Sequence, residues 1–130
     1  MKGSCLCGCV EYEVDQLVGP IRHCHCQSCR KAQAAAFSSN GRAMREHFRW
    51  LKGKEKLSHY ESSPGKLRHF CSNCGSPLMA EWLHEDQVIV RIATLDDVPQ
   101  VGEFEHIWMS HDLEWLNYDA ALKGFPKAPQ

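Results

Sequence analysis

The stretch Cys71-Ser72-Asn73-Cys74-Gly75 decides the fold that this sequence predicts, because a CxxC turn followed by glycine is typical of a zinc knuckle. Backbone N–H groups in such a turn point at the thiolates, and Gly75 relieves the strain of the chain reversal. A second close pair, Cys5-Leu6-Cys7, stands near the N-terminus and is followed by Gly8. Four thiolates close a tetrahedral zinc shell, so the two pairs together predict one structural site. We call Cys5, Cys7, Cys71 and Cys74 the four-cysteine group.

Between the two pairs lies Cys24-His25-Cys26-Gln27-Ser28-Cys29. Its thiols form the three-cysteine group, Cys24, Cys26 and Cys29. No further cysteine, histidine or carboxylate follows at knuckle spacing, so the fourth coordination position is open. Zinc held by three thiolates is a poor Lewis acid, but it lowers the pKa of an arriving thiol from its usual value of about 8.5. The group therefore predicts a catalytic zinc that takes a thiol and makes or breaks carbon–sulfur bonds.

Other interpretations of the three-cysteine group stay open on the sequence alone. His23, His25 or Cys9 would close the shell as a fourth ligand and make the site purely structural. Closely spaced thiols beside cations would also suit a redox switch. Cys9 itself has three interpretations: an inert buried thiol, a ligand that closes the second zinc site, or a thiol near the mouth of the pocket.

The eight cysteines would also allow a disulfide framework, which is typical of secreted proteins. The first residues contain no apolar signal segment, and no later stretch approaches the roughly 18 apolar residues of a membrane-spanning helix. We therefore expect a cytoplasmic protein with metal-bound thiols. The 15 basic and 16 acidic side chains give a net charge of −1, which favours neither nucleic acid nor an anionic membrane as a partner.

Short runs of alternating polarity, separated by Gly, Pro, Ser and Asp, predict a mainly β domain. The runs are 9–14, 47–51, 57–60, 66–70, 78–82, 88–92 and 105–109, with a tight turn expected at 62–65. Helical propensity is confined to 30–36 and 112–122, which predicts one or two short helices. We expect a single domain over 1–123 and a flexible tail over 124–130.

Basic residues flank the predicted metal sites. Arg30 and Lys31 directly follow the three-cysteine group, and Lys66 and Arg68 precede the knuckle. These cations would neutralise the zinc thiolates, or they would hold the carboxylates of an acidic thiol.

Four segments spread over most of the chain resemble the glutathione-dependent formaldehyde-activating enzyme family, which includes the centromere protein V group. They are Gly3-Ser4-Cys5-Leu6-Cys7-Gly8, Cys24-His25-Cys26-Gln27-Ser28-Cys29-Arg30-Lys31, Arg68-His69-Phe70-Cys71-Ser72-Asn73-Cys74-Gly75-Ser76-Pro77-Leu78 and Thr94-Leu95-Asp96-Asp97. The resemblance implies a small Mss4-like fold of short antiparallel strands, a structural zinc on the four-cysteine group and a labile, catalytic zinc on the three-cysteine group. The activity it implies is condensation of formaldehyde with glutathione to S-(hydroxymethyl)glutathione, formally the reverse of a carbon–sulfur lyase reaction.

Two positions depart from the family pattern. Cys9 stands where a small residue such as alanine is usual, and Ala34-Ala35 stands where a glycine is common. Phe37 is the aromatic residue that the pattern places a few residues further on. With Arg30 and Lys31, Phe37 completes the predicted substrate contacts.

The sequence thus predicts a cytoplasmic enzyme with two zinc ions, the second partly occupied, that acts on a small thiol such as glutathione. A hypothesis from another class is a non-catalytic, zinc-stabilised module that binds a protein, as the Mss4-like fold can do. The four tryptophans and the strand expected around Ile107-Trp108-Met109 would suit a homodimer joined through β-strands. The sequence names neither the thiol nor the aldehyde.

Overall fold

The computed structural model describes residues 1–118 and 121–128, which form two β-sheets and one α-helix. The strands are β1 Lys2–Ser4, β2 Glu11–Val14, β3 Val18–Cys24, β4 Ser38–Met44, β5 Phe48–Lys52, β6 Leu57–Ser63, β7 Lys66–Cys71, β8 Pro77–Trp82, β9 Gln87–Arg91 and β10 Phe104–Ile107, and the helix is α1 Gln27–Gln33. Short 3-10 turns are η1 Arg45–His47, η2 Lys54–Lys56, η3 Ile92–Thr94 and η4 Met109–His111. None of the helices in the described residues is long and apolar enough to cross a membrane.

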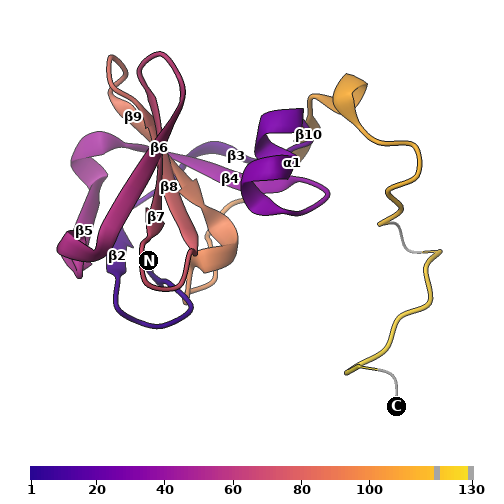
Figure 1. Ribbon diagram of the computed structural model, residues 1–130, viewed down its shortest axis with the longest axis horizontal. Coiled ribbons are helices and arrows are strands. Elements are labelled where there is room, and N and C mark those ends of the chain that lie inside the picture. The colour runs from indigo at the N-terminus through magenta and orange to yellow at the C-terminus, as the bar shows by residue number, and fades with distance from the viewer. Residues whose placement is uncertain (119–120, 129–130) are drawn as a thin grey trace.

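The small sheet has the order β1-β2-β5 and the large one β10-β3-β4-β9-β8-β7-β6 (Figure 1). The mainly β fold predicted from the sequence is confirmed. One strand pair corrects the expectation of antiparallel strands, because β10 runs parallel to β3, with Phe104 opposite Ile21 and Ile107 opposite Cys24. A parallel pair needs a long connection, and here most of the chain lies between the two strands.

The hydrophobic core lies between the two sheets. Tyr12 and Val14 on β2 are fully buried, as is Val90 on β9, because alternate residues of each strand face inward. Tyr12 stacks on Phe48 with ring centroids 5.3 Å apart, and its hydroxyl group lies 2.8 Å from Thr94 Oγ1. Burial raises the pKa of Tyr12 to about 12. One face of the large sheet therefore covers the hydrophobic core, and the candidate site lies on its other face.

The seven predicted runs correspond to β2 and β5 to β10, whereas β1, β3 and β4 were not predicted. The sequences of β3 and β4, VGPIRHC and SSNGRAM, contain few β-forming residues. They form strands because β3 pairs with β10 and β4, and β4 pairs with β9. Tertiary pairing therefore overrides weak local propensity.

The helix predicted at 30–36 begins earlier, at Gln27, because Cys26 caps it, and it ends where Ala34 turns left-handed with φ 49°. The strand predicted over 105–109 ends at Ile107, because Trp108 has φ 60° and starts η4. The helix predicted over 112–122 is wrong for 112–118 and 121–122, and residues 119–120 lie outside the described residues.

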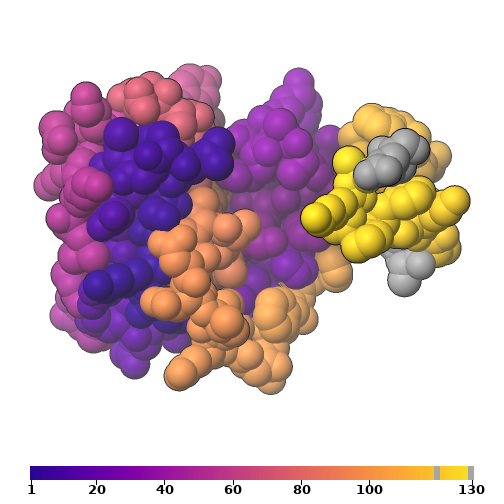
Figure 2. All heavy atoms as spheres, turned by 90° about the horizontal axis from the view of Figure 1, so that it is seen from below, coloured from indigo at the N-terminus to yellow at the C-terminus, as the bar shows by residue number. Residues whose placement is uncertain are grey.

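The C-terminal segment leaves the sheets after η4 and extends away from them (Figures 1 and 2). Residues 124–128 contain no helix or strand, and the rest of the predicted tail, 129–130, lies outside the described residues.

Candidate functional site

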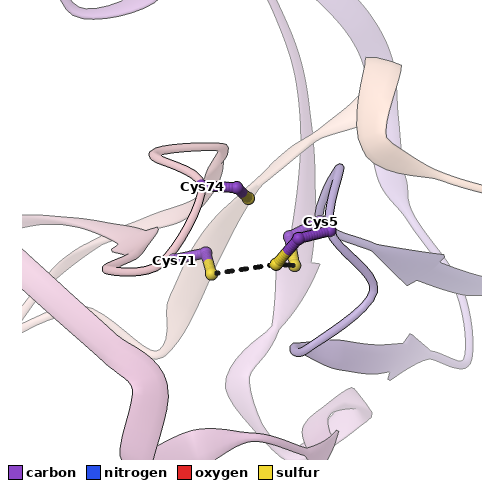
Figure 3. A group of neighbouring side chains, drawn as sticks. Cys5, Cys71 and Cys74 are labelled. Atoms are coloured by element: carbon purple, nitrogen blue, oxygen red, sulfur yellow. Dashed lines mark hydrogen bonds between the residues drawn. The ribbon is translucent and has the colours of Figure 1, made fainter.

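The structure brings the four-cysteine group together from the loop after β1, the last residue of β7 and the turn that follows β7. The sulfur atoms all lie within 4.8 Å of one another, and Figure 3 shows Cys5, Cys71 and Cys74 converging. Cys7 Sγ lies 3.6 Å from Cys5 Sγ and 3.9 Å from Cys71 Sγ. Sulfurs held about 2.3 Å from a tetrahedral zinc ion are about 3.8 Å apart, so the donors fit this metal.

Hydrogen-bond donors around the four-cysteine group favour thiolates. Asn73 Nδ2 donates to Cys7 Sγ at 3.2 Å and lowers the pKa of that thiol to about 7. The bond between Ser76 and Cys74, 3.2 Å long, lowers the pKa of Cys74 to about 5. Burial instead raises the pKa of Cys71 to about 11, so the thiolate form of Cys71 depends most on stabilisation by a bound cation.

Cys9 lies beside the four-cysteine group. Its sulfur is 3.8 Å from Asn73 Nδ2, the same amide that donates to Cys7. Its side chain is half-buried, and a hydrogen bond with Cys7 raises the pKa of Cys9, which keeps it a neutral thiol. Among the described residues, its sulfur is not one of those that lie within 4.8 Å of one another in either cysteine group.

We predict that Cys9→Ala leaves the zinc content unchanged and lowers the free energy of unfolding by at most about 1–2 kcal/mol, because only a small half-buried group is removed. Elemental analysis per chain and chemical denaturation would measure the two quantities. Loss of a zinc ion from the variant would instead make Cys9 a ligand.

The three-cysteine group lies where β3 ends and α1 begins. Its three sulfurs also lie within 4.8 Å of one another. Cys26 caps α1 by accepting from Cys29 N at 3.4 Å, so the helix start itself orients two of the thiols. A hydrogen bond with Cys24 lowers the pKa of Cys29 to about 4 and raises that of Cys24; Arg68, whose Nη1 is 4.0 Å from Cys29 Sγ, adds to the lowering. One thiolate is thus stabilised before any metal arrives.

The neighbouring histidines point elsewhere. His25 is fully buried, with Nδ1 3.0 Å from Asp112 Oδ1 and Nε2 2.8 Å from His106 Nδ1, so both ring nitrogens are occupied. His23 Nδ1 lies 2.9 Å from Ser39 Oγ. Within residues 1–118 and 121–128, no fourth Cys, His, Asp or Glu joins the three sulfurs. This arrangement can hold a metal ion and leave one position for a ligand from outside.

The residues predicted to contact substrate lie outside the cavity beside the three-cysteine group. Arg30 donates to the backbone oxygens of His25 and His111, at 3.0 and 3.2 Å. Phe37 packs against the rings of His23 and His25, with centroids 4.6 and 5.1 Å apart. Lys31 is exposed and borders a different hollow. Arg30 and Phe37 instead support the segment that carries the thiols.

A cavity of about 360 Å³ opens directly onto the three-cysteine group. Five cations line it, which we call the basic face: Arg22, Arg42, Lys66, Arg68 and Arg91. Strand register explains why they meet. Arg22 on β3 is opposite Asn40 on β4, and Asn40 is opposite Arg91 on β9. A second row of opposite residues runs from Arg42 on β4 across β9 and β8 to Arg68 on β7. Opposite residues share a face, so all five cations share the face turned away from the core.

Arg91 is the most buried member of the basic face, with 4% of its surface exposed. Its Nη1 donates to Ser38 Oγ at 3.1 Å and also to Asn40, while no partner for Nε lies within the described part of the chain. Burial lowers the pKa of Arg91 to about 10 and also lowers that of Lys66. A buried guanidinium with a spare donor, close to three thiols, indicates a site built for anions.

Sequence reasoning identified Lys66 and Arg68 but missed Arg22, Arg42 and Arg91. The signal was present once β3 is recognised, since Arg22 is two residues from Cys24 and shares its face.

Comparisons with known proteins identify the family of this chain. Residues 1–111 match the family described as glutathione-dependent formaldehyde-activating enzyme, and the chain belongs to that family. A curated protein of Halomonas elongata named "Putative glutathione-dependent formaldehyde-activating enzyme" is 28% identical over 145 residues, which cover 97% of this chain and 88% of that protein. A crystal structure of a Rhodobacter sphaeroides protein superimposes with a TM-score of 0.68 at 29% identity, over 82% of this chain and 99% of the other.

Proposed function

We propose that the protein is a zinc-dependent enzyme that makes or breaks the carbon–sulfur bond of a thiol–aldehyde adduct, as in S-(hydroxymethyl)glutathione synthesis. The observation that carries the proposal is a three-thiol site without a fourth protein ligand among the described residues, opening into a cavity lined by cations. Membership of the glutathione-dependent family supports the same chemistry.

The four-cysteine group would hold a structural zinc and the three-cysteine group a catalytic one. Zinc bound at the three-cysteine group would lower the pKa of a coordinated thiol. The chain's own part is to orient the substrate and to balance charge. Arg68, 4.0 Å from Cys29 Sγ, and the buried Arg91 stabilise the anionic sulfur atoms, and α1 holds Cys26 and Cys29 in place.

In the synthetic direction the substrate sulfur forms a bond to the aldehyde carbon, and the carbonyl π electrons move to oxygen. The proton that the thiol gave up completes the new hydroxyl group, so the adduct contains all the atoms of both reactants. Cleavage is the reverse. In this proposal the thiol would enter the cavity with its sulfur toward the three-cysteine group and its acidic groups along the basic face, which the lining residues support.

We predict that zinc-loaded protein binds glutathione and releases close to one proton per thiol bound, because the thiol enters as its thiolate. Calorimetry in two buffers of different ionisation enthalpy would count the proton. S-Methylglutathione is the matched control: it keeps both carboxylates but has no proton to release from sulfur.

Absence of binding by every thiol offered at millimolar concentration, glutathione and N-acetylglutathione included, to fully zinc-loaded protein would remove the enzymatic proposal. The zinc-stabilised protein-binding module would then be the better hypothesis. Binding without proton release would place the thiol away from the metal and would contradict the assigned role of the three-cysteine group.

A further inference from the structure

The charges that line the cavity limit which thiol it can hold. Five arginine and lysine side chains line it, and no aspartate or glutamate is among the lining residues that the structure describes. Glu105, which is opposite Arg22 on β10, is already paired with Arg22 Nε at 3.0 Å. The cavity therefore offers many partners to anions and no free carboxylate to an ammonium group.

The aromatic residues of the lining also have basic neighbours. Lys66 Nζ lies over the Trp82 ring, 4.9 Å from its centroid. Trp108 packs against His111, with centroids 5.0 Å apart. An ammonium group can bind the face of a tryptophan ring, but both of these rings already have a basic side chain packed against them.

The cations fall into two sets by their distance from the thiols. Arg68 and Arg91 lie near the three-cysteine group, because Arg68 contacts Cys29 and Arg91 donates to Ser38, which is opposite Cys24. Arg42 stands further off. Ser38 is opposite Cys24, and Arg42 is four residues further along β4, or about 14 Å at the usual rise per residue.

Arg42 is free to bind an anion at that far end. Its side chain is exposed to the cavity, and its Nη1 makes only a long hydrogen bond of 3.4 Å to Gln87 Oε1 in the described structure. A guanidinium can hold a carboxylate through two parallel hydrogen bonds.

We propose that the cavity selects thiols whose charged groups are all anionic, with Arg42 holding the anion furthest from the sulfur, and that it disfavours a thiol carrying an α-ammonium group. The inference rests on the proposed function, because it assumes that a thiol sulfur faces the three-cysteine group. An ammonium group in this cavity loses its water, gains no carboxylate and faces five like charges. Removing its charge by acylation removes that cost.

The test compares matched thiols that differ only in the ammonium group. Calorimetry on zinc-loaded protein would compare glutathione with N-acetylglutathione, and cysteine with N-acetylcysteine. Each acetylated thiol should bind with a Kd about tenfold or more below that of its partner, and the gap should shrink at high salt. Equal or tighter binding of the ammonium-bearing thiols would overturn the inference.

Variants then test Arg42. Arg42→Gln should raise the Kd of N-acetylglutathione about tenfold, and Arg42→Lys should recover part of the loss. Lys54→Gln, which removes one positive charge from exposed η2 outside the cavity lining, should change nothing. An unchanged Kd in folded Arg42→Gln protein would overturn the role of Arg42. Failure of every thiol to bind would instead overturn the proposed function, so the two failures are distinguishable.

Discussion

Cys71→Ser should unfold the protein or make it insoluble, with loss of the zinc ion bound by the four-cysteine group. This group joins the loop after β1 to the end of β7 and the turn that follows it, which are far from that loop in the chain. A structural zinc contributes an apparent binding free energy of about 10–16 kcal/mol, whereas the net stability of a domain is about 5–15 kcal/mol. The binding free energy of the zinc ion is therefore as large as the net free energy of unfolding, so loss of the ion should unfold the domain.

Cys26→Ser is the matched control. Serine is a good N-cap, so α1 keeps its start, and the second metal site is the one that changes. We expect this variant to stay folded, with a melting temperature near that of the parent and about one zinc ion per chain. The parent should hold between one and two. Thermal denaturation and elemental analysis give both quantities, and equal destabilisation by the two substitutions would show that both sites are structural.

The grouping of the cysteines was the part of the site that the sequence predicts most directly. A tetrahedral shell takes four thiolates, so two incomplete pairs must combine whatever fold joins them. That rule needs no knowledge of strand register. It joins Cys5 and Cys7 to Cys71 and Cys74, whose sulfurs lie within 4.8 Å of one another in the structure.

The basic face could not be predicted in the same way. Arg42 lies on β4, a strand with few β-forming residues, and whether it shares a face with Arg91 depends on the register between β4 and β9. Register is set by pairing across the sheet, which local patterns do not contain. The cations adjacent to cysteines in sequence, Arg30 and Lys31, lie outside the cavity as a result.

The segment after β10 shows the same limit. Its composition predicts a helix, but Asp112 instead accepts from the Tyr118 hydroxyl at 2.9 Å and pairs with buried His25. A contact between residues 25 and 112 leaves no trace in local propensity. It does, however, hold the residue between two of the predicted zinc ligands.

The second large effect is expected from Gly53→Ala, because Gly53 supports both halves of the four-cysteine group. Its Cα faces the backbone of Cys9, and an added Cβ would overlap the Cys9 carbonyl oxygen and lie 2.8 Å from its carbonyl carbon. On its other side, Gly53 accepts a hydrogen bond from Lys56 N at 2.8 Å, and Lys56 in turn accepts from Ser72 N in the knuckle. A shift of Gly53 would therefore displace both cysteine pairs.

We expect Gly53→Ala to lower the free energy of unfolding by about 2–5 kcal/mol, from the strain of a left-handed alanine at φ +74° and the clash with rigid backbone.

Gly19→Ala separates the two causes. Gly19 has φ +71°, but nothing lies within 4 Å of the added Cβ, so this variant should lose only about 1–2 kcal/mol. Zinc affinity should fall in the Gly53 variant alone, since that clash moves the metal loop; chelator competition and chemical denaturation measure the two effects. Equal losses in the two variants would mean that backbone strain acts by itself and that the contact with Cys9 does not support the metal site.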